Sequence, residues 1–342
     1  MLGIQTLLFW TLLCFIVALA LPTVNATKIY VNVSSTKIPL GTQSNPCKTL
    51  ACGLRRSKDG NTIFVTPGTY TGENNCNLCN ATNCPSNFTM IGTGLASEVI
   101  ISAYNISSDR AFSLYNVLYA KLANFTFQNF FLLQHLTYSE QLLTNTIPNG
   151  GGAVTATISN LHFSNVIFQN NSAAEGGAVR AINSNVTFEG CTFLSNVGGL
   201  YGGAVLAETS NIVVVNSVFI DNVAEGSQDL GVDGTGGAIY AVGGATTAFS
   251  ISFSHFQNNS AGQSGGAMYI RSASTLSENQ VVVTIADTVF ESNTIKGYGN
   301  CLTIASCDAG GGAVYIDAPT VTITRCNFTN NKASTLASNS VT

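Results

Sequence analysis

The chain has 342 residues, of which 45% are hydrophobic and 9% are charged, and it contains 33 glycines. This composition excludes a disordered chain, because the apolar residues suffice for a substantial core. A formal net charge of −4 and the lack of any run of Lys or Arg exclude the electrostatic footprint of a protein that binds nucleic acid or an anionic membrane.

Residues 1–26 have the pattern of a signal peptide. An apolar stretch from Leu7 to Leu21 is followed by Pro22 and the small-residue site Val24-Asn25-Ala26, which predicts cleavage after Ala26. The stretch is about 15 residues long, whereas a membrane-spanning helix needs ~20, so a retained anchor is the weaker alternative. No later segment is long and apolar enough to cross a membrane. We therefore expect a secreted or cell-surface protein with no transmembrane segment after the signal peptide.

Residues 29–104 carry four segments in a fixed order: IYVN, GTQSNPCKTLACGL, DGNTIFVTPGTYTG and NFTMIGTGLASEVIISA. They resemble the N-terminal cap of pectin-lyase-like β-helix proteins. The resemblance implies that a short amphipathic helix at about Cys47 to Lys58 covers the first rung, and that TIFVTPGTY begins the β-helix. We expect residues 27–104 to form this cap and the first rungs.

Nine cysteines follow the signal peptide, and a secreted chain is expected to oxidise them. Cys76, Cys79 and Cys84 have the spacing of half a zinc site. No nearby His or second Cys pair completes such a site, which favours disulfides. We expect the N-terminal five to fasten the cap to the first rung, and Cys301 and Cys307 to close a Gly-rich loop. The disulfide candidates are Cys47, Cys52, Cys76, Cys79, Cys84, Cys301 and Cys307.

Two short units alternate from residue 151 onward. A Gly-Gly-Ala-apolar unit begins at Gly151, Gly176, Gly202, Gly236, Gly265 and Gly311. A Phe-x-x-Asn unit pairs Phe168 with Asn171, Phe193 with Asn196, Phe219 with Asn222, Phe256 with Asn259, Phe290 with Asn293, and Phe328 with Asn331. Successive Gly-Gly-Ala units are 25, 26, 34, 29 and 46 residues apart, which indicates a rung of about 25 residues with loop insertions.

Each rung contains short runs of alternating polarity such as GGAVYI and VTITRCNF, which predict strands and are too short for helices. One rung cannot bury its own apolar face, whereas rungs stacked ~4.8 Å apart bury a continuous column. The sequence therefore predicts an all-β fold, a right-handed parallel β-helix, with repeats over residues 105–342. A phosphate-binding role for the glycines is disfavoured, because no helix follows them and no Lys accompanies them.

The repeat residues have expected structural roles. Paired glycines permit a tight corner, Phe residues in register form an internal ladder, and stacked Asn residues form a ladder of side-chain hydrogen bonds. Cys191 and Cys326 stand two residues before a ladder Phe and are expected to be buried thiols in the core.

Residues 150–331 resemble the repeats of the chlamydial polymorphic outer membrane protein family, which are defined by the pair GGA[ILV] and FxxN. That resemblance implies a role in adhesion or matrix interaction. Ten Asn-x-Ser/Thr sequons are permissive for a eukaryotic secretory route, although chance alone gives a similar number. The one at Asn25 lies in the signal peptide, and the glycosylation candidates are Asn32, Asn80, Asn87, Asn105, Asn124, Asn170, Asn185, Asn258 and Asn327.

A polysaccharide-cleaving enzyme would need clustered carboxylates for Ca²⁺ or for acid catalysis. The repeats lack paired Asp, Gly-His-Gly and Arg-Ile-Lys motifs, and the histidines, which lack sequence partners, are interpreted as ordinary exposed residues: His135, His162 and His255. One acidic cluster is interpreted as a solvated loop, with Ca²⁺ binding as the alternative: Asp221, Glu225, Asp229 and Asp233. We predict no catalytic, cofactor-binding or metal-binding residue.

The sequence thus favours a non-catalytic adhesin or extracellular interaction module whose partner is an unidentified protein or carbohydrate, with no nucleic acid. The alternative is a carbohydrate-active lyase or hydrolase. After Asn331 the sequence ends in KASTLASNSVT without another Gly-Gly-Ala strand. We expect either a longer parent protein or a last rung that another subunit covers, because solenoid ends are normally capped.

Overall fold

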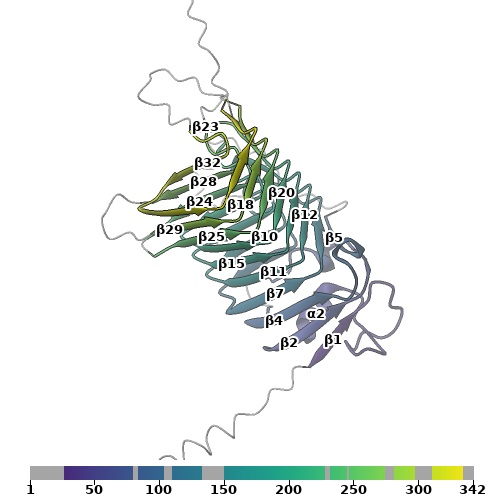
Figure 1. Cartoon of the computed structure of the whole chain (residues 1–342). Coiled ribbons are helices and arrows are strands. Elements are labelled where there is room, and N and C mark those ends of the chain that lie inside the picture. The colour runs from purple at the N-terminus through teal and green to yellow at the C-terminus, as the bar shows by residue number, and fades with distance from the viewer. Residues whose placement is uncertain are drawn as a thin grey trace, which may run out of the picture.

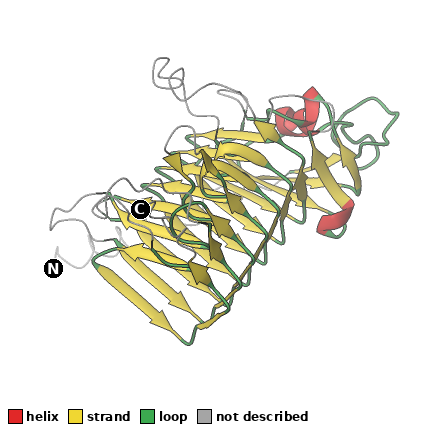
Figure 2. Ribbon diagram, turned by 90° about the horizontal axis from the view of Figure 1, so that it is seen from above, coloured by secondary structure: helices red, strands yellow, loops and turns green. Residues whose placement is uncertain are grey.

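The computed structural model describes residues 27–79, 84–103, 110–132, 150–227, 232–244, 246–273, 281–296 and 310–333, with only the backbone at 227, 232 and 233. The chain winds into a right-handed parallel β-helix, which confirms the predicted fold class (Figure 1). A complete coil passes through four parallel sheets, here called A, B, D and C in the order in which the chain visits them. Figure 2 shows the coils stacked along the axis of the molecule.

Sheet A has ten strands, and buried positions alternate with outward positions along its strands, except in β33 of the last described coil, which is exposed throughout. Its strands are β1 (Lys28–Val31), β2 (Asn61–Val65), β4 (Asn87–Gly92), β7 (Tyr119–Ala123), β11 (Asn160–Ser164), β15 (Asn185–Glu189), β19 (Asn211–Val215), β25 (Ala248–Ser252), β29 (Val282–Ala286) and β33 (Thr320–Thr324).

Sheet B has nine short strands, each of which follows a strand of sheet A. From β8 onward two residues separate the two strands, and the first of them has a positive φ. Its strands are β3 (Gly68–Tyr70), β5 (Val99–Ser102), β8 (Thr126–Gln128), β12 (Ile167–Gln169), β16 (Thr192–Leu194), β20 (Val218–Ile220), β26 (His255–Gln257), β30 (Val289–Glu291) and β34 (Asn327–Thr329).

Sheets D and C have seven strands each and are joined by the Gly-Gly-Ala units. Sheet D contains β9 (Phe131–Leu132), β13 (Ser172–Glu175), β17 (Val197–Tyr201), β21 (Val223–Ala224), β27 (Ser260–Ala261), β31 (Thr294–Ile295) and β35 (Lys332–Ala333). Sheet C contains β6 (Phe112–Tyr115), β10 (Val154–Thr157), β14 (Val179–Ile182), β18 (Val205–Glu208), β24 (Ile239–Gly243), β28 (Met268–Ser272) and β32 (Val314–Asp317). A small antiparallel hairpin of β22 (Gly226–Ser227) and β23 (Val232–Asp233) leaves the coil before β24.

Helix α2 (Leu50–Arg56) covers the N-terminal end and is shorter than the expected Cys47 to Lys58. Thr49 is its N-cap, with Oγ1 accepting from the backbone N–H of Cys52 at 3.3 Å, and the extended backbone of Ser57 ends it. Leu50 and Leu54 are buried in the core. Two short 3₁₀ turns follow, at Glu73–Asn75 and Ala96–Glu98.

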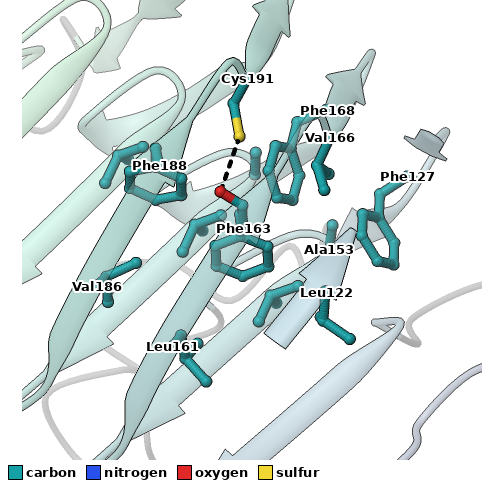
Figure 3. Packing of buried hydrophobic residues seen from close by; sticks show 14 of the residues in the cluster. Leu122, Phe127, Ala153, Leu161, Phe163, Val166, Phe168, Val186, Phe188 and Cys191 are labelled. Atoms are coloured by element: carbon teal, nitrogen blue, oxygen red, sulfur yellow. Dashed lines mark hydrogen bonds between the residues drawn. The ribbon is translucent and has the colours of Figure 1, made fainter. Parts of the chain in front are cut away.

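The interior is an aromatic ladder (Figure 3). Six rings are fully buried and stack in succession with centroids 4.4–5.4 Å apart: Phe127, Phe168, Phe193, Phe219, Phe256 and Phe290. Phe127 belongs to this ladder although it precedes the repeats that the sequence singled out. Phe328 stacks on Phe290 at 4.8 Å but is 48% exposed, because it lies in the last described coil.

A second ladder runs beside the rings at the corner between sheets B and D. Each ladder Asn donates from Nδ2 to Oδ1 of the next at 2.9–3.0 Å, from Asn171 through Asn196, Asn222, Asn259 and Asn293 to Asn331. The Nδ2 atoms also donate to Phe carbonyl groups of the preceding coil, as Asn196 does to Phe168 at 3.0 Å. These amides are therefore satisfied inside the solenoid, where an unpaired polar group would be costly.

Candidate binding surface

From β7 onward, the length of the coil varies only where the chain enters or leaves sheet C. From the start of a sheet A strand to the ladder Asn the chain keeps one interval, as from Asn160 to Asn171 and from Asn211 to Asn222. Insertions instead lie between sheets D and C, at residues 133–149, 226–233 and 297–309, and between sheets C and A, at residues 274–280. Because loops tolerate variation and carry function on a rigid scaffold, sheet C is the side of the coil to search for a site.

The outer face of sheet C carries two rows of side chains in register, which we call the sheet C surface. The first row is Ser113, Thr155, Arg180, Leu206, Tyr240, Tyr269 and Tyr315. The second row is Tyr115, Thr157, Ile182, Glu208, Val242, Arg271 and Asp317. Successive side chains along a strand point to opposite faces, and the intervening positions, such as Val179 and Ala181, belong to the internal core.

Four tyrosines form a continuous stack on this surface. Tyr201, at the end of β17, stacks on Tyr240 at 4.7 Å, Tyr240 on Tyr269 at 5.3 Å, and Tyr269 on Tyr315 at 4.7 Å. Tyr240 is only 9% exposed, whereas Tyr201, Tyr269 and Tyr315 are half-buried. The stack is thus a rigid row of phenol groups, with little side-chain entropy to lose on binding. Burial raises the pKa of Tyr240 to about 12, so its hydroxyl stays protonated and can donate.

A charged cluster continues the first row toward the N-terminus. Arg180, 5% exposed, lies between two carboxylates: its Nε is 3.1 Å from Oε2 of Glu175, and its Nη2 is 3.6 Å from Oε2 of Glu208. Burial raises the pKa of Glu175 above its usual value, while the charge and the hydrogen bond of Arg180 oppose the rise. The guanidinium therefore neutralises a carboxylate that would otherwise be buried without a cation.

Replacing Arg180 with Met should lower the free energy of unfolding by about 3–5 kcal/mol at neutral pH, because it leaves Glu175 buried without its cation. Because the pKa of Glu175 is higher in the folded than in the unfolded protein, the folded state is favoured while this carboxyl is protonated. This contribution to the free energy of unfolding is present at low pH and is lost as the pH rises through the folded-state pKa. The deficit should therefore shrink in acidic buffer, and the double variant Glu175→Gln with Arg180→Met should recover part of it. Urea unfolding at several pH values measures both effects, and equal, pH-independent losses for the single and double variants would contradict the pairing.

The predicted N-terminal cysteines form local links. Disulfides join Cys47 to Cys52 and Cys79 to Cys84. Cys47 also pairs with Val31 of β1 through a backbone bridge, so the first disulfide fastens helix α2 to the first strand. Cys76 is buried, with its Sγ 3.8 Å from the carbonyl oxygen of Ser102. The pair Cys301 and Cys307 lies outside the described residues.

The remaining two cysteines occupy a hydroxyl position rather than a purely apolar one. In other coils this slot holds Ser217, Ser254 or Thr288, whose hydroxyls accept from the backbone N–H of the preceding coil, as Ser217 does from Cys191 at 3.1 Å. Cys191 is buried with its Sγ 3.5 Å from the carbonyl oxygen of Phe163, and burial raises its pKa to about 12. Cys326 is half-buried, in contrast to the expectation for both.

Two histidines have partners that sequence spacing does not reveal. Nε2 of His162 lies 3.0 Å from Oε2 of Glu189 on the next coil, and Nε2 of His255 lies 3.4 Å from Oε2 of Glu291. Both side chains are half-buried and not exposed as expected, and their neighbours are set by the register of the coils. That neither histidine is catalytic stays a prediction. His135 lies outside the described residues.

The acidic cluster is only partly described, because Asp229 and the side chain of Asp233 are not covered. Asp221 occupies a corner between sheets B and D and is exposed, as is Glu225. Across the residues that the structure describes, no three His, Cys, Asp or Glu side chains are grouped so that they could hold a metal ion.

The tyrosine stack was not predicted, although the sequence contains a signal for it. Tyr240, Tyr269 and Tyr315 each stand two residues after the Ala of a Gly-Gly-Ala unit, so the repeat in these coils is Gly-Gly-Ala-x-Tyr. The Arg180 cluster has no such signal, because its two carboxylates come from different coils.

The stacked parallel sheets and internal ladders define a right-handed parallel β-helix protein. In its repeats the chain segment through sheets A and B has a constant length, whereas the segments that lead into and out of sheet C vary in length. The model of the family described as right handed beta helix region matches residues 113–282, from β6 into β29. No curated protein sequence matches the chain. Of the helices in the described part of the chain, none has the length and apolar character of a membrane span.

Three solved structures are similar to the chain at a low level. A rhamnogalacturonan lyase has a TM-score of 0.43 and 14% identity, over 79% of this chain and 74% of that one. The catalytic domain of a GH87 alpha-1,3-glucanase in complex with nigerose has a TM-score of 0.27 and 11% identity, over 91% of this chain and 66% of that one. The A-module of the Azotobacter vinelandii mannuronan C-5 epimerase AlgE4 has a TM-score of 0.21 and 12% identity, over 80% and 87%. No conclusion about this chain's activity rests on these scores.

Proposed function

We propose that the protein is a secreted or cell-surface, non-catalytic recognition module that binds an extracellular protein or carbohydrate through the sheet C surface. The observation that carries the proposal is the row of stacked tyrosines, Tyr201, Tyr240, Tyr269 and Tyr315, between the two edges where the coil varies in length. Tyrosine combines a large apolar ring with a hydrogen-bonding hydroxyl, and it is enriched at binding interfaces. The resemblance to chlamydial adhesive repeats agrees with this proposal and remains a prediction.

The charged cluster on the same surface favours binding over hydrolysis. A glycosidase needs two carboxyl groups with a sugar bond or a water between them. Here the guanidinium of Arg180 contacts both Glu175 and Glu208 and fills the space between them. Glu175, whose side chain is 14% exposed, is thus held by an ion pair inside the protein, which does not suit it to donate a proton to a substrate.

The proposal is tested by screening the purified protein on arrays of polysaccharides and extracellular proteins. Each bound polysaccharide is then incubated with the protein and assayed for new reducing ends and for unsaturated sugars. We expect binding without release of either product. Appearance of reducing or unsaturated ends would show that the enzyme alternative is right, and the absence of any bound ligand across both arrays would count against a recognition module.

A further inference from the structure

Seven of the predicted glycosylation sites lie on described residues, and they share one side of the coil. Within the described ranges, none is on a strand of sheet C or sheet D. They lie on or beside sheets A and B, or at the corners that follow these sheets: Asn32, Asn87, Asn124, Asn170, Asn185, Asn258 and Asn327.

The surroundings of the side-chain amide divide these sites. Nδ2 of Asn124, a half-buried corner residue, donates to the carbonyl oxygen of Gly92 at 3.2 Å. Nδ2 of Asn185 donates to Oδ1 of Asn160 at 2.6 Å, within a row of surface Asn side chains. An amide nitrogen that already contacts the protein in this way has less freedom to carry a bulky sugar.

Two corner sites have the opposite character. Asn170 and Asn258 occupy equivalent corners between sheets B and D, with φ of 52° and 54°. Both side chains are exposed, and neither side-chain amide makes a hydrogen bond with another described residue. Their backbone N–H groups donate to carbonyl groups of the next coil, Asn170 to Leu194 and Asn258 to Glu291, both at 3.0 Å. The next residues, Asn171 and Asn259, turn inward to the Asn ladder, so the corner residues themselves face solvent.

We propose that Asn170 and Asn258 carry N-linked glycans and that Asn124 does not. The proposal rests on the secretory route that forms part of the proposed function. Sheet D lies between the glycan-bearing corner and sheet C. The sugars would therefore cover the side of the coil formed by sheets A and B and leave the sheet C surface open to its partner. Asn124 is a matched comparison, because it is also a corner residue with a positive φ, of 60°, and is the first residue of a complete sequon.

The test is to express the chain in eukaryotic secretory cells, with a heterologous signal peptide in place of residues 1–26. Enzymatic removal of N-glycans in ¹⁸O water then marks each occupied Asn, and peptide mass spectrometry gives occupancy at each site. Site-by-site reading is required because Asn80 and Asn105, outside the described residues, are also sequons. We expect label at Asn170 and Asn258 and none at Asn124.

Variants that keep the corner Asn separate glycosylation from folding. Ser172→Ala and Ser260→Ala destroy the sequons of Asn170 and Asn258, and each should remove one glycan from the secreted protein. Asn124→Gln should leave the glycan mass unchanged. Label at Asn124 equal to that at Asn170, or unlabelled Asn170 and Asn258 in secreted protein, would overturn the proposal. This assay does not measure ligand binding. A chain with the expected glycans that binds no ligand would contradict the proposed function but not the proposed glycosylation.

Discussion

Replacing Phe193 with Ala should lower the free energy of unfolding by about 3–5 kcal/mol. The ring is fully buried, stacks on Phe168 at 4.8 Å and on Phe219 at 4.4 Å, and meets Phe188 edge-on at 5.1 Å. Truncation leaves a cavity that the neighbouring coils cannot fill, because their rings are held in register by the strands on either side. Chemical denaturation followed by circular dichroism measures the loss.

Phe253 provides the control for this substitution. It is 61% exposed at a corner between sheets A and B, so Phe253→Ala should change the stability by no more than about 0.5 kcal/mol. A loss below about 1 kcal/mol for Phe193→Ala, or equal losses for the two variants, would show that the internal ladder does not hold the coils together.

Replacing Gly203 with Ala should cost about 3 kcal/mol or more, or prevent folding, because the second glycine of each Gly-Gly-Ala unit packs directly on the backbone of the next coil. A Cβ added to Gly203 would collide with the carbonyl oxygen of Gly237 and with the backbone of Val223. Neither neighbour can move without breaking the stacked sheets.

Gly199 lies four residues earlier in the same coil and is the matched control. A Cβ there meets its nearest neighbour, Cα of Ala174, at 3.5 Å, which is an ordinary contact. Gly199→Ala should therefore leave the protein folded with nearly unchanged stability. Thermal melts of the two variants decide the point, and a Gly203→Ala protein as stable as Gly199→Ala would contradict the account of the Gly-Gly corner.

The interior of this fold could be predicted from sequence because each coil repeats the same contacts. Phe193 and Asn196 recur at fixed offsets, since a side chain that stacks on its equivalent in the next coil must occupy the same slot. Glycine pairs recur because no Cβ fits between adjacent coils at Gly203 and Gly237. Such constraints are local to a rung and therefore visible as a repeat.

The sheet C surface could not be predicted in the same way. The contact of Arg180 with Glu208 joins residues of different coils, and so, on sheet A, does that of His162 with Glu189. Their alignment depends on where each insertion is placed, and unequal spacing between the Gly-Gly-Ala units hides it. The tyrosine stack is the exception, because a Tyr stands two residues after the Ala in three of these units.

If recognition takes place on the sheet C surface, replacing Tyr269 with Ala should weaken it. Tyr269 stands between Tyr240 and Tyr315 in the stack, and its removal should weaken binding of the ligand found on the arrays by about tenfold or more. Tyr30, which stacks on Phe64 at 5.6 Å on the outer face of sheet A, is the matched control, and Tyr30→Ala should bind like the wild type. Titration of the immobilised ligand with the three proteins gives the comparison. Unchanged affinity for Tyr269→Ala, or equal weakening by Tyr30→Ala, would contradict the placement of the binding site on sheet C.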